Sequence, residues 1–362
     1  MSAFAEREAR PLDGTSRIVV PGPRSGQPAP PPPPPTARPL PERLFVWVTA
    51  LVLALLTVVV GCRVLGVDGV TPVPQLLAFL PLLLVPTAVA LLCCALLRWR
   101  AGLVWGLVLL AVTGWFERPY EAGAAVSRGP VVARITVLTS NVEFGQATLG
   151  LIAAIRREKP DLVFVQECEF TCAQLLSVRI PHADYPYRHI VKAGGSEGSA
   201  ILSTVPLTNT GGIASTLAMP GSAARFGGLA VPVRLQLAHP LPPIPGAVDS
   251  WRTELGKVRA YAAAHRGDGP GIIAGDFNAS RDHATFRDVL DAGELRDSAP
   301  LGGAGRTPSW PSGARRPFGA QIDHVLVSRD FSVRGARFID LAHTDHRSLL
   351  VTLDLHGPEP KK

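Results

Sequence analysis

Three apolar segments follow one another in the first third of the chain. The first, Leu44–Cys62, contains no charged residue and is long enough to cross a bilayer as a helix. The second, Gly69–Leu97, is also free of charge, and Pro81 and Pro86 inside it predict a kink. The third, Ala101–Phe116, is the shortest. Because a single soluble core could not bury three such runs, we expect three transmembrane helices within residues 44–118.

The arginines around these segments predict an orientation. Two precede the first segment and two lie between the second and the third (Arg38, Arg43, Arg98 and Arg100). The positive-inside rule places both groups in the cytoplasm. With three spans, the chain from Glu117 onward then lies outside the cytoplasm, as part of a multi-pass protein of the cell membrane. If the third segment does not cross, this part faces inward.

Two polar regions border the apolar segments. Residues 1–43 contain an unbroken proline run, Pro30–Pro35, and cannot bury enough apolar surface to fold, so we expect a disordered cytoplasmic tail. Residues 119–130 resemble a short linker. Of the formal net charge of +7, the first 128 residues carry +4, which leaves +3 for the rest. This small charge does not give the broad basic surface typical of a nonspecific DNA-binding protein.

From Val131 the pattern changes to strands that alternate with helices, which predicts an α/β domain over residues 131–357. We expect strands at residues 134–141, 161–165, 199–203, 230–237, 271–274, 322–328, 331–339 and 348–355, and helices at residues 149–157, 248–265 and 283–292. This order suits two packed sheets with related halves.

Polar side chains stand at the ends of several predicted strands. Glu167 follows an apolar strand directly, and Asp276 and Asn278 follow another, two residues apart. Asp345 and His346 precede the last strand. Hydrolysis of a phosphate ester needs a divalent cation held by carboxylates, a base for the attacking water, and donors for the phosphoryl oxygens. These residues supply all three.

His346 can donate to a phosphate only when it is protonated, and a nearby carboxylate would keep it so. Asp323 is the candidate partner. Each motif has a simpler interpretation, since Gly275-Asp276-Phe277-Asn278 alone could be a turn, Asp323 could cap a strand, and His239 could be a surface histidine. Arg315 and Arg316 either bind a polyanionic substrate or form a solvated pair.

Taken together, the motifs resemble those of the endonuclease/exonuclease/phosphatase superfamily over about residues 131–356. They are, in order, Asn141, Gln166-Glu167, His239, Gly275-Asp276-Phe277-Asn278, Ile322-Asp323-His324 and Asp345-His346. The resemblance implies a four-layered α/β sandwich, with two packed mixed sheets flanked by helices, that uses Mg²⁺ or Mn²⁺.

The resemblance also implies a role for each residue. Glu167 is the metal ligand, and Asp345 is a second carboxylate near the metal. Asn141 and Asn278 lie against the phosphate. Asp276 aligns the nucleophilic water, while His346 stabilises the transition state and is oriented by Asp323. His239 matches a phosphate-contacting histidine, although its context, Ala238-His239-Pro240, departs from the usual Thr-His-Leu.

The layout, with three spans before an exported domain, resembles the VanJ-type membrane proteins of actinobacteria associated with teicoplanin resistance. This resemblance implies a membrane-anchored phosphohydrolase or phosphodiesterase whose substrate is a lipid-linked phosphate or pyrophosphate of the cell envelope. A short linker would hold the site near the headgroups and raise the effective concentration of such substrates. Two alternatives remain, a surface nuclease that degrades extracellular DNA or RNA and an inactive membrane-bound interaction module.

Cys168 and Cys172 lie beside the Glu167 motif. On one helix their spacing would place them on the same face. They are either two buried thiols or a short disulfide, and a disulfide would require an oxidising compartment.

Overall fold

The computed structural model describes residues 39–118, 129–227 and 229–358. Residues 1–38 of the predicted disordered tail and most of the predicted linker therefore lie outside the described residues. The last four residues of the predicted tail, 40–43, are instead the first turn of helix α1 (Leu40–Leu65). The chain divides into two units, Met1–Leu40 and Pro41–Lys362, and the second holds the elements that position the site.

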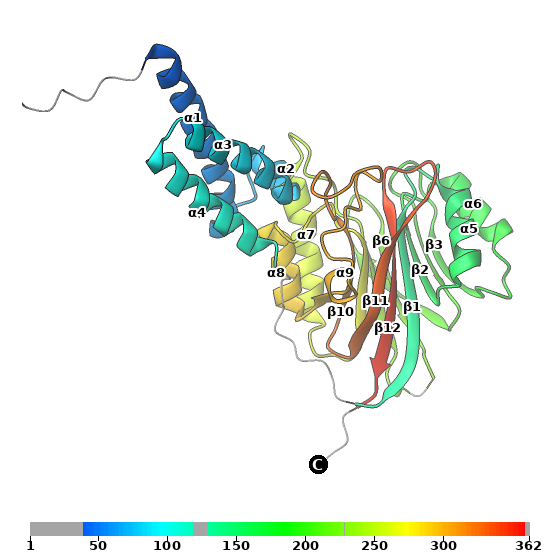
Figure 1. Cartoon of the computed structure of the whole chain (residues 1–362). Coiled ribbons are helices and arrows are strands. Elements are labelled where there is room, and N and C mark those ends of the chain that lie inside the picture. Colours follow the sequence, from blue (N-terminus) through cyan, green and yellow to red (C-terminus); the bar gives the residue numbers. More distant parts are fainter. Residues whose placement is uncertain (1–38, 119–128, 228, 359–362) are drawn as a thin grey trace, which may run out of the picture. The chain divides into compact units, whose positions relative to one another are not determined.

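Two six-stranded mixed sheets form the centre of the α/β domain (Figure 1). The first sheet has the order β11-β12-β1-β2-β4-β3, and the second has the order β5-β6-β7-β8-β10-β9. The strands of the first sheet are β1 (Val131–Asn141), β2 (Leu162–Gln166), β3 (Tyr187–Val191), β4 (Ser199–Ser203), β11 (Phe331–Asp340) and β12 (Arg347–His356). Those of the second are β5 (Leu207–Ile213), β6 (Met219–Ala224), β7 (Val233–Ala238), β8 (Gly271–Asp276), β9 (Arg296–Asp297) and β10 (Asp323–Val327).

Each sheet has one parallel pair at its centre, and this pair decides where the polar motifs meet. In the first sheet β1 runs parallel to β2, with Asn141 opposite Gln166. In the second sheet β7 runs parallel to β8, and β10 pairs antiparallel to β8 with Asp323 opposite Asp276. The motifs at these strand ends are therefore brought to the same edge of the sandwich.

Helices cover the outer face of each sheet and make four layers. α5 (Thr148–Glu158) and α6 (Phe170–Arg179) pack on the first sheet, and α7 (Val248–Ala264) and α8 (Ala284–Gly293) pack on the second (Figure 1). A short helix, α9 (Ser298–Leu301), follows β9. The central core between the sheets consists of inward-facing aliphatic and Phe side chains from both sheets, whose burial supplies the main driving force for packing. The predicted four-layered sandwich is confirmed.

The predicted strands and helices are all present, with ends displaced by one to three residues. The sequence reading missed α6, β3, β5, β6, β9 and α9. Gly211 and Gly212 interrupt β5, and Pro220 and Gly221 interrupt β6, so neither strand has the β-branched pattern that predicts an extended segment. These strands form through pairing with their neighbours instead.

The expectation of three transmembrane helices is wrong for the described residues. Only α1 (Leu40–Leu65), with 26 residues and a mean hydropathy of 2.7, is long and apolar enough to span a membrane. The second segment is broken into α2 (Val73–Ala78), the 3₁₀ turn η1 (Leu80–Leu83) and α3 (Leu84–Leu96). The multi-pass topology is therefore not supported.

The reason lies in helix length and in proline chemistry. Pro81 has no backbone N–H and its ring clashes with the preceding turn, so the helix is interrupted at η1. The 13 residues of α3 then reach about 20 Å, and the 17 residues of α4 (Arg100–Phe116) about 26 Å, both short of a hydrocarbon core of roughly 30 Å.

Polar contacts join the segment after α1 to the start of α8. Asp68 accepts hydrogen bonds from the backbone N–H and the hydroxyl of Thr285, at 2.8 and 2.9 Å. Arg63 donates to the buried Asp282 at 3.1 Å, and His283 lies 2.8 Å from the carbonyl of Pro74. These contacts use a loop that follows the Gly275–Asn278 motif directly.

Candidate active site

Glu167 lies immediately after β2, at the edge where the two sheets meet. Its backbone is left-handed, with φ of +56°, a conformation that is costly for a residue other than glycine and is concentrated at functional sites. Its carboxylate accepts hydrogen bonds from Asn141 Nδ2 at 3.1 Å and from the backbone N–H of Phe144 at 3.0 Å. The side chain is 15% exposed, so it is held in place while remaining open to solvent.

Asp276 lies at the end of β8 and faces the same point from the other sheet. Its Oδ2 accepts from Asn141 Nδ2 at 3.1 Å, and its Oδ1 accepts from the backbone N–H of Asn278 at 2.8 Å. The amide of Asn141 therefore bridges Glu167 and Asp276. Burial raises the pKa of Asp276, against the lowering effect of nearby His346, and this makes the ionised carboxylate a stronger base.

Glycine is required before Asp276. Gly275 has φ of +154°, and a Cβ at this position would overlap the carbonyl oxygen of Ala238 on the parallel strand β7. The close approach of β7 and β8 therefore depends on the missing side chain. It also aligns the end of β7, where His239 follows, with the end of β8.

His346 and Asp323 form a buried pair beside Asp276. The His346 Nδ1 atom lies 2.9 Å from Asp323 Oδ2, and its Nε2 atom lies 3.7 Å from Asp276 Oδ2. Burial alone would lower the pKa of His346, but Asp323 and Asp276 together raise it to about 10. The imidazole is therefore protonated at neutral pH and can donate from Nε2.

His239 is 1% exposed and lies in the same cluster. Its Nε2 atom is 3.8 Å from Glu167 Oε1 and 4.0 Å from Asp276 Oδ2. Burial lowers the pKa of His239, against the raising effect of Asp276. The unusual Ala238-His239-Pro240 context therefore still brings this histidine to the other candidates.

Asp345 and Asn278 lie at the rim of the cluster. The carboxylate of Asp345 is 48% exposed, accepts from Trp310 Nε1 at 2.7 Å and lies 3.7 Å from His346 Nε2. The amide of Asn278 donates to the carbonyl of Pro240 at 3.0 Å, so part of its donor capacity is already used. All eight residues singled out from the sequence thus belong to one constellation.

The donors fit a hard divalent cation. Glu167 and Asp345 offer partly exposed carboxylate oxygens, and Asn141 offers an amide oxygen, the ligands that Mg²⁺ prefers. Asp276, Asp323 and His346 also have ligand atoms within 4.8 Å of one another. We favour the first group, because a protonated His346 has no lone pair for a metal and already donates from Nδ1 to Asp323 Oδ2.

Several residues that hold the site were missed in the sequence. Ser309 accepts from the backbone N–H groups of Ile322 and Asp323, and Thr344 donates to the carbonyl of Asn141 at 3.1 Å. Glu143 accepts from the backbone N–H of Asp345 at 2.7 Å. Isolated Ser, Thr and Glu residues in loops carry no spacing signal, so only the tertiary contacts identify them.

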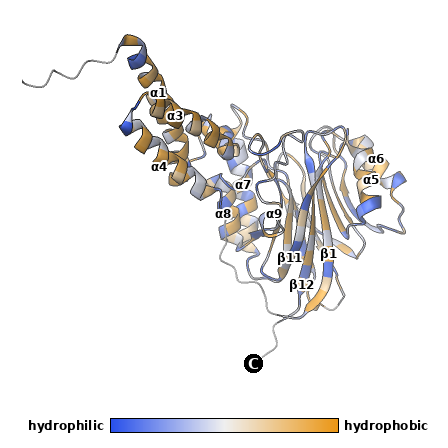
Figure 2. Ribbon diagram, in the orientation of Figure 1, coloured by the Kyte–Doolittle hydropathy of each residue, from blue (hydrophilic) through white to orange (hydrophobic). Residues whose placement is uncertain are grey.

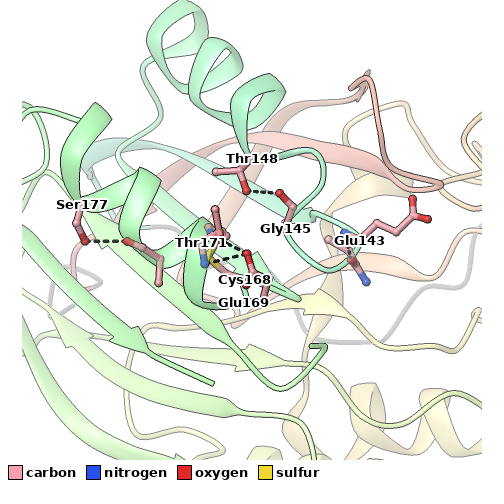
Figure 3. Close-up of a disulfide and its surroundings, with 10 residues drawn as sticks. Glu143, Gly145, Thr148, Cys168, Glu169, Thr171 and Ser177 are labelled. Carbon is pink, nitrogen blue, oxygen red and sulfur yellow. Dashed lines mark hydrogen bonds between the residues drawn. A yellow bond between two sulfur atoms is a disulfide. The ribbon is translucent and has the colours of Figure 1, made fainter. Parts of the chain in front are cut away.

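A disulfide joins Cys168 to Cys172, directly after Glu167 (Figure 3). Both cysteines are buried, and Glu169 between them caps α6 by accepting from the backbone N–H groups of Thr171 and Cys172. The disulfide and the cap together fix the turn in which Glu167 holds its left-handed backbone. Of the two interpretations of this cysteine pair, the structure has the disulfide.

The fold and the site define a hydrolase of the phosphoesterase type. The sequence profile of the Endonuclease/Exonuclease/phosphatase family matches residues 138–346, more than half of the chain. The chain therefore belongs to this family, whose members are metal-dependent phosphoester hydrolases. No curated protein sequence matches the chain.

Solved structures are similar to this chain at low sequence identity. D. rerio TDP2 complexed with a single strand DNA product is 16% identical, with a TM-score of 0.50 over 61% of this chain and 99% of that one. An endonuclease/exonuclease/phosphatase from Beutenbergia cavernae is 19% identical, with a TM-score of 0.49 over 62% of this chain and 72% of that one. Sphingomyelinase C from Streptomyces griseocarneus is 15% identical, with a TM-score of 0.46 over 61% and 99%.

Proposed function

We propose that this protein is a membrane-anchored, divalent-metal-dependent phosphohydrolase whose active site lies outside the cytoplasm. The observation that carries the proposal is the bridge from the amide of Asn141 to the carboxylates of Glu167 and Asp276, at 3.1 Å each. This bridge joins the ends of β2 and β8, which belong to different sheets. A fold that needed these groups only for packing would not gather buried carboxylates around one amide.

Each residue has a chemical role in the proposal. Asp276 is placed to orient the attacking water and accept its proton, because its carboxylate is buried and its pKa is raised. His346, held protonated by Asp323, donates from Nε2 to the charge that develops on the phosphoryl oxygens. His239 lies between the two carboxylates, and Asn278 lies at the rim on the side of Asp276.

Glu167 and Asp345 would hold Mg²⁺ or Mn²⁺. When bound, the cation neutralises the phosphoryl oxygens and polarises the phosphorus centre. The hydrogen bonds from Asn141 and from the backbone of Phe144 hold the Glu167 carboxylate in one orientation, which favours a site organised in advance of binding. The substrate panel described below compares Mg²⁺ with Mn²⁺.

Two observations support the membrane anchor and the side of the membrane. α1 has the length and hydropathy of a spanning helix, and two arginines precede its apolar run. A single span with a cytoplasmic N-terminus places the catalytic domain outside the cytoplasm. Arg98 and Arg100 then lie outside as well, so only the arginines before α1 support this orientation. The Cys168–Cys172 disulfide agrees with this location, since such bonds persist in oxidising compartments and are rare in the cytosol.

We further propose that the substrate is a lipid-linked phosphate or pyrophosphate of the cell envelope. A site tethered through α1 meets membrane substrates at a higher effective concentration than soluble ones. The resemblance to the VanJ-type proteins was based on the three-span layout and on motif order, and only the motif order now supports it.

The test is a substrate panel with the full chain in detergent. Lipid pyrophosphate, phospholipid, inositol phosphate and plasmid DNA would be incubated with Mg²⁺, Mn²⁺ or EDTA. We expect phosphate release from the lipid substrates, its loss in EDTA, and a loss of about 10³-fold or more in Glu167→Ala and in Asp276→Ala. Unchanged turnover in both variants would eliminate the proposal.

The same panel separates the alternatives. Plasmid nicking with a strong salt dependence, without lipid hydrolysis, would make the protein a surface nuclease. Absence of both turnover and metal binding would leave a membrane-bound interaction module. Asp249→Asn, an exposed acidic residue on α7, serves as the matched control for loss of charge.

A further inference from the structure

A cavity lies where the segment around η1 and the end of α4 meet the loop before α8, the end of α9 and the loops that follow α9. Its volume is about 540 Å³. Pro81, Leu84 and Glu117 line one side, and residues of the loops at 281, 300–306 and 316–319 line the other. None of the eight candidate catalytic residues lines it, so this cavity is separate from the site described above.

Three arginines, Arg281, Arg306 and Arg316, line this cavity. Arg281 is 8% exposed, and its guanidinium donates to the carbonyl of Glu117 at 2.9 Å. In the part of the chain that the structure describes, no carboxylate oxygen lies within 4.0 Å of it. Arg316 is exposed and donates to the carbonyl of Gly305 and to Thr307, again with no carboxylate partner among the described residues.

The nearby carboxylates do not balance these cations. Arg306 pairs with Asp282, which Arg63 already shares, and its Nε atom lies 3.4 Å from Glu117. Three carboxylates, those of Asp282, Glu117 and Asp297, thus lie near the four guanidinium groups of Arg63, Arg281, Arg306 and Arg316. Burial disfavours the charged form of Arg281 and lowers its pKa to about 10. A buried charge without a partner is expensive unless a ligand supplies one.

Four of the residues that line the cavity are apolar, although Glu117 lies on the same side as Pro81 and Leu84. Pro81 and Leu84 begin the apolar run that continues as α3, and Pro300 and Pro317 face them. Next to these prolines, Leu301 and Phe318 are 47% and 59% exposed. Figure 2 shows the apolar character of α1, α3 and α4 in contrast to the mixed surface of the α/β domain. The arginines and these apolar residues together suit an amphiphile, a molecule with a charged head and an apolar chain.

We propose that this cavity binds a phosphate-headed amphiphile, an anionic lipid whose phosphate meets Arg281, Arg306 and Arg316 while its chain follows Pro81 and Leu84. The planar guanidinium fork matches phosphate oxygens in pairs, so two or three arginines can hold one headgroup. The site acts by binding alone and is independent of the proposed hydrolysis.

The experiment measures binding by titration calorimetry with the full chain in detergent and EDTA. The probes are monomeric dihexanoyl phosphatidic acid, dihexanoyl phosphatidylcholine and inorganic phosphate. Phosphatidic acid should bind, and Arg281→Gln and Arg316→Gln should each weaken it about 10-fold, the value of one charge-assisted hydrogen bond. Arg225→Gln, an exposed arginine of the α/β domain, should leave it unchanged.

Controls distinguish this site from the catalytic one. Arg281→Lys keeps the charge and should recover part of the affinity, and Arg316 is exposed enough that its variant should stay folded. Glu167→Ala should not change the binding, whatever its effect on turnover. Equal affinity of Arg316→Gln and Arg225→Gln, or equal binding of phosphatidylcholine or inorganic phosphate, would overturn the proposal.

Discussion

Asp323 shows how one carboxylate controls a neighbouring cation. Its Oδ2 holds His346 Nδ1 at 2.9 Å, and its backbone is fixed by Ser309. Its Oδ1 has no hydrogen-bond partner among the described residues. Asp323 is fully buried, so its negative charge acts mainly on the adjacent imidazolium of His346.

Asp323→Asn should therefore lower kcat by about 10²–10⁴, because the amide no longer stabilises the imidazolium or fixes its orientation. The measurement is steady-state kinetics on the best substrate of the panel, with circular dichroism to check the fold. Asp249→Asn should change neither. A kcat within a factor of three of the parent would contradict the proposed role.

Gly275 tests the packing of β7 against β8. Gly275→Ala should destabilise the domain by about 3 kcal/mol or more, because the new methyl group overlaps the Ala238 carbonyl and the backbone is left-handed. Gly271→Ala, on the same strand but with open space around it, is the control. Urea unfolding should separate the two variants clearly, and equal stability would refute the steric argument.

At the scale of elements, buried charges connect α1 to the start of α8. Asp282 is fully buried between Arg63 and Arg306, and Thr285 of α8 is held by Asp68. The two arginines lower the pKa of Asp282, although burial alone would raise it. The helical segment is thus joined to the domain through a carboxylate that must stay ionised.

This lowered pKa predicts an acid-sensitive junction. A carboxylate with a folded pKa below its unfolded value of about 3.8 stabilises the fold above that pH, and the contribution is lost as pH falls through the folded pKa. In thermal unfolding experiments, the melting temperature of the parent protein should fall more steeply from pH 6 to pH 2 than that of the Asp282→Asn variant. Parallel pH profiles for the two proteins would argue against the junction.

At the scale of the whole molecule, the proposed membrane anchor is the single helix α1. Leu55 is at the middle of α1 and is 60% exposed. Leu55→Arg should weaken insertion by about 2.5–3.5 kcal/mol and shift protein into the carbonate-extractable fraction, whereas Leu55→Ala should not. If both variants remain in the membrane fraction equally, α1 is not the anchor.

Much of this protein could be predicted from its sequence. Glu167, Asp276 and His346 each stand beside an apolar strand, and that local pattern predicted an α/β domain with polar groups at its strand ends. The four-layered sandwich and the roles of the eight site residues came from the family resemblance, and these roles stay predictions. The sequence did not predict α6 or β5, because their residues have weak local preferences and are ordered by neighbours. It also overestimated the number of spans, since the prolines predicted a kink within one spanning helix, whereas the segment is broken into α2, η1 and α3.

What the sequence determined by itself was local, namely the strand ends, the polar groups on them and the long apolar helix, since each depends on neighbours in the chain. Only the tertiary structure decided that Asn141 bridges two sheets, that Cys168 and Cys172 are bonded, and that Arg281 is buried without a carboxylate partner among the described residues. These features depend on strand register and on contacts between distant segments, and neither can be predicted from the local sequence pattern.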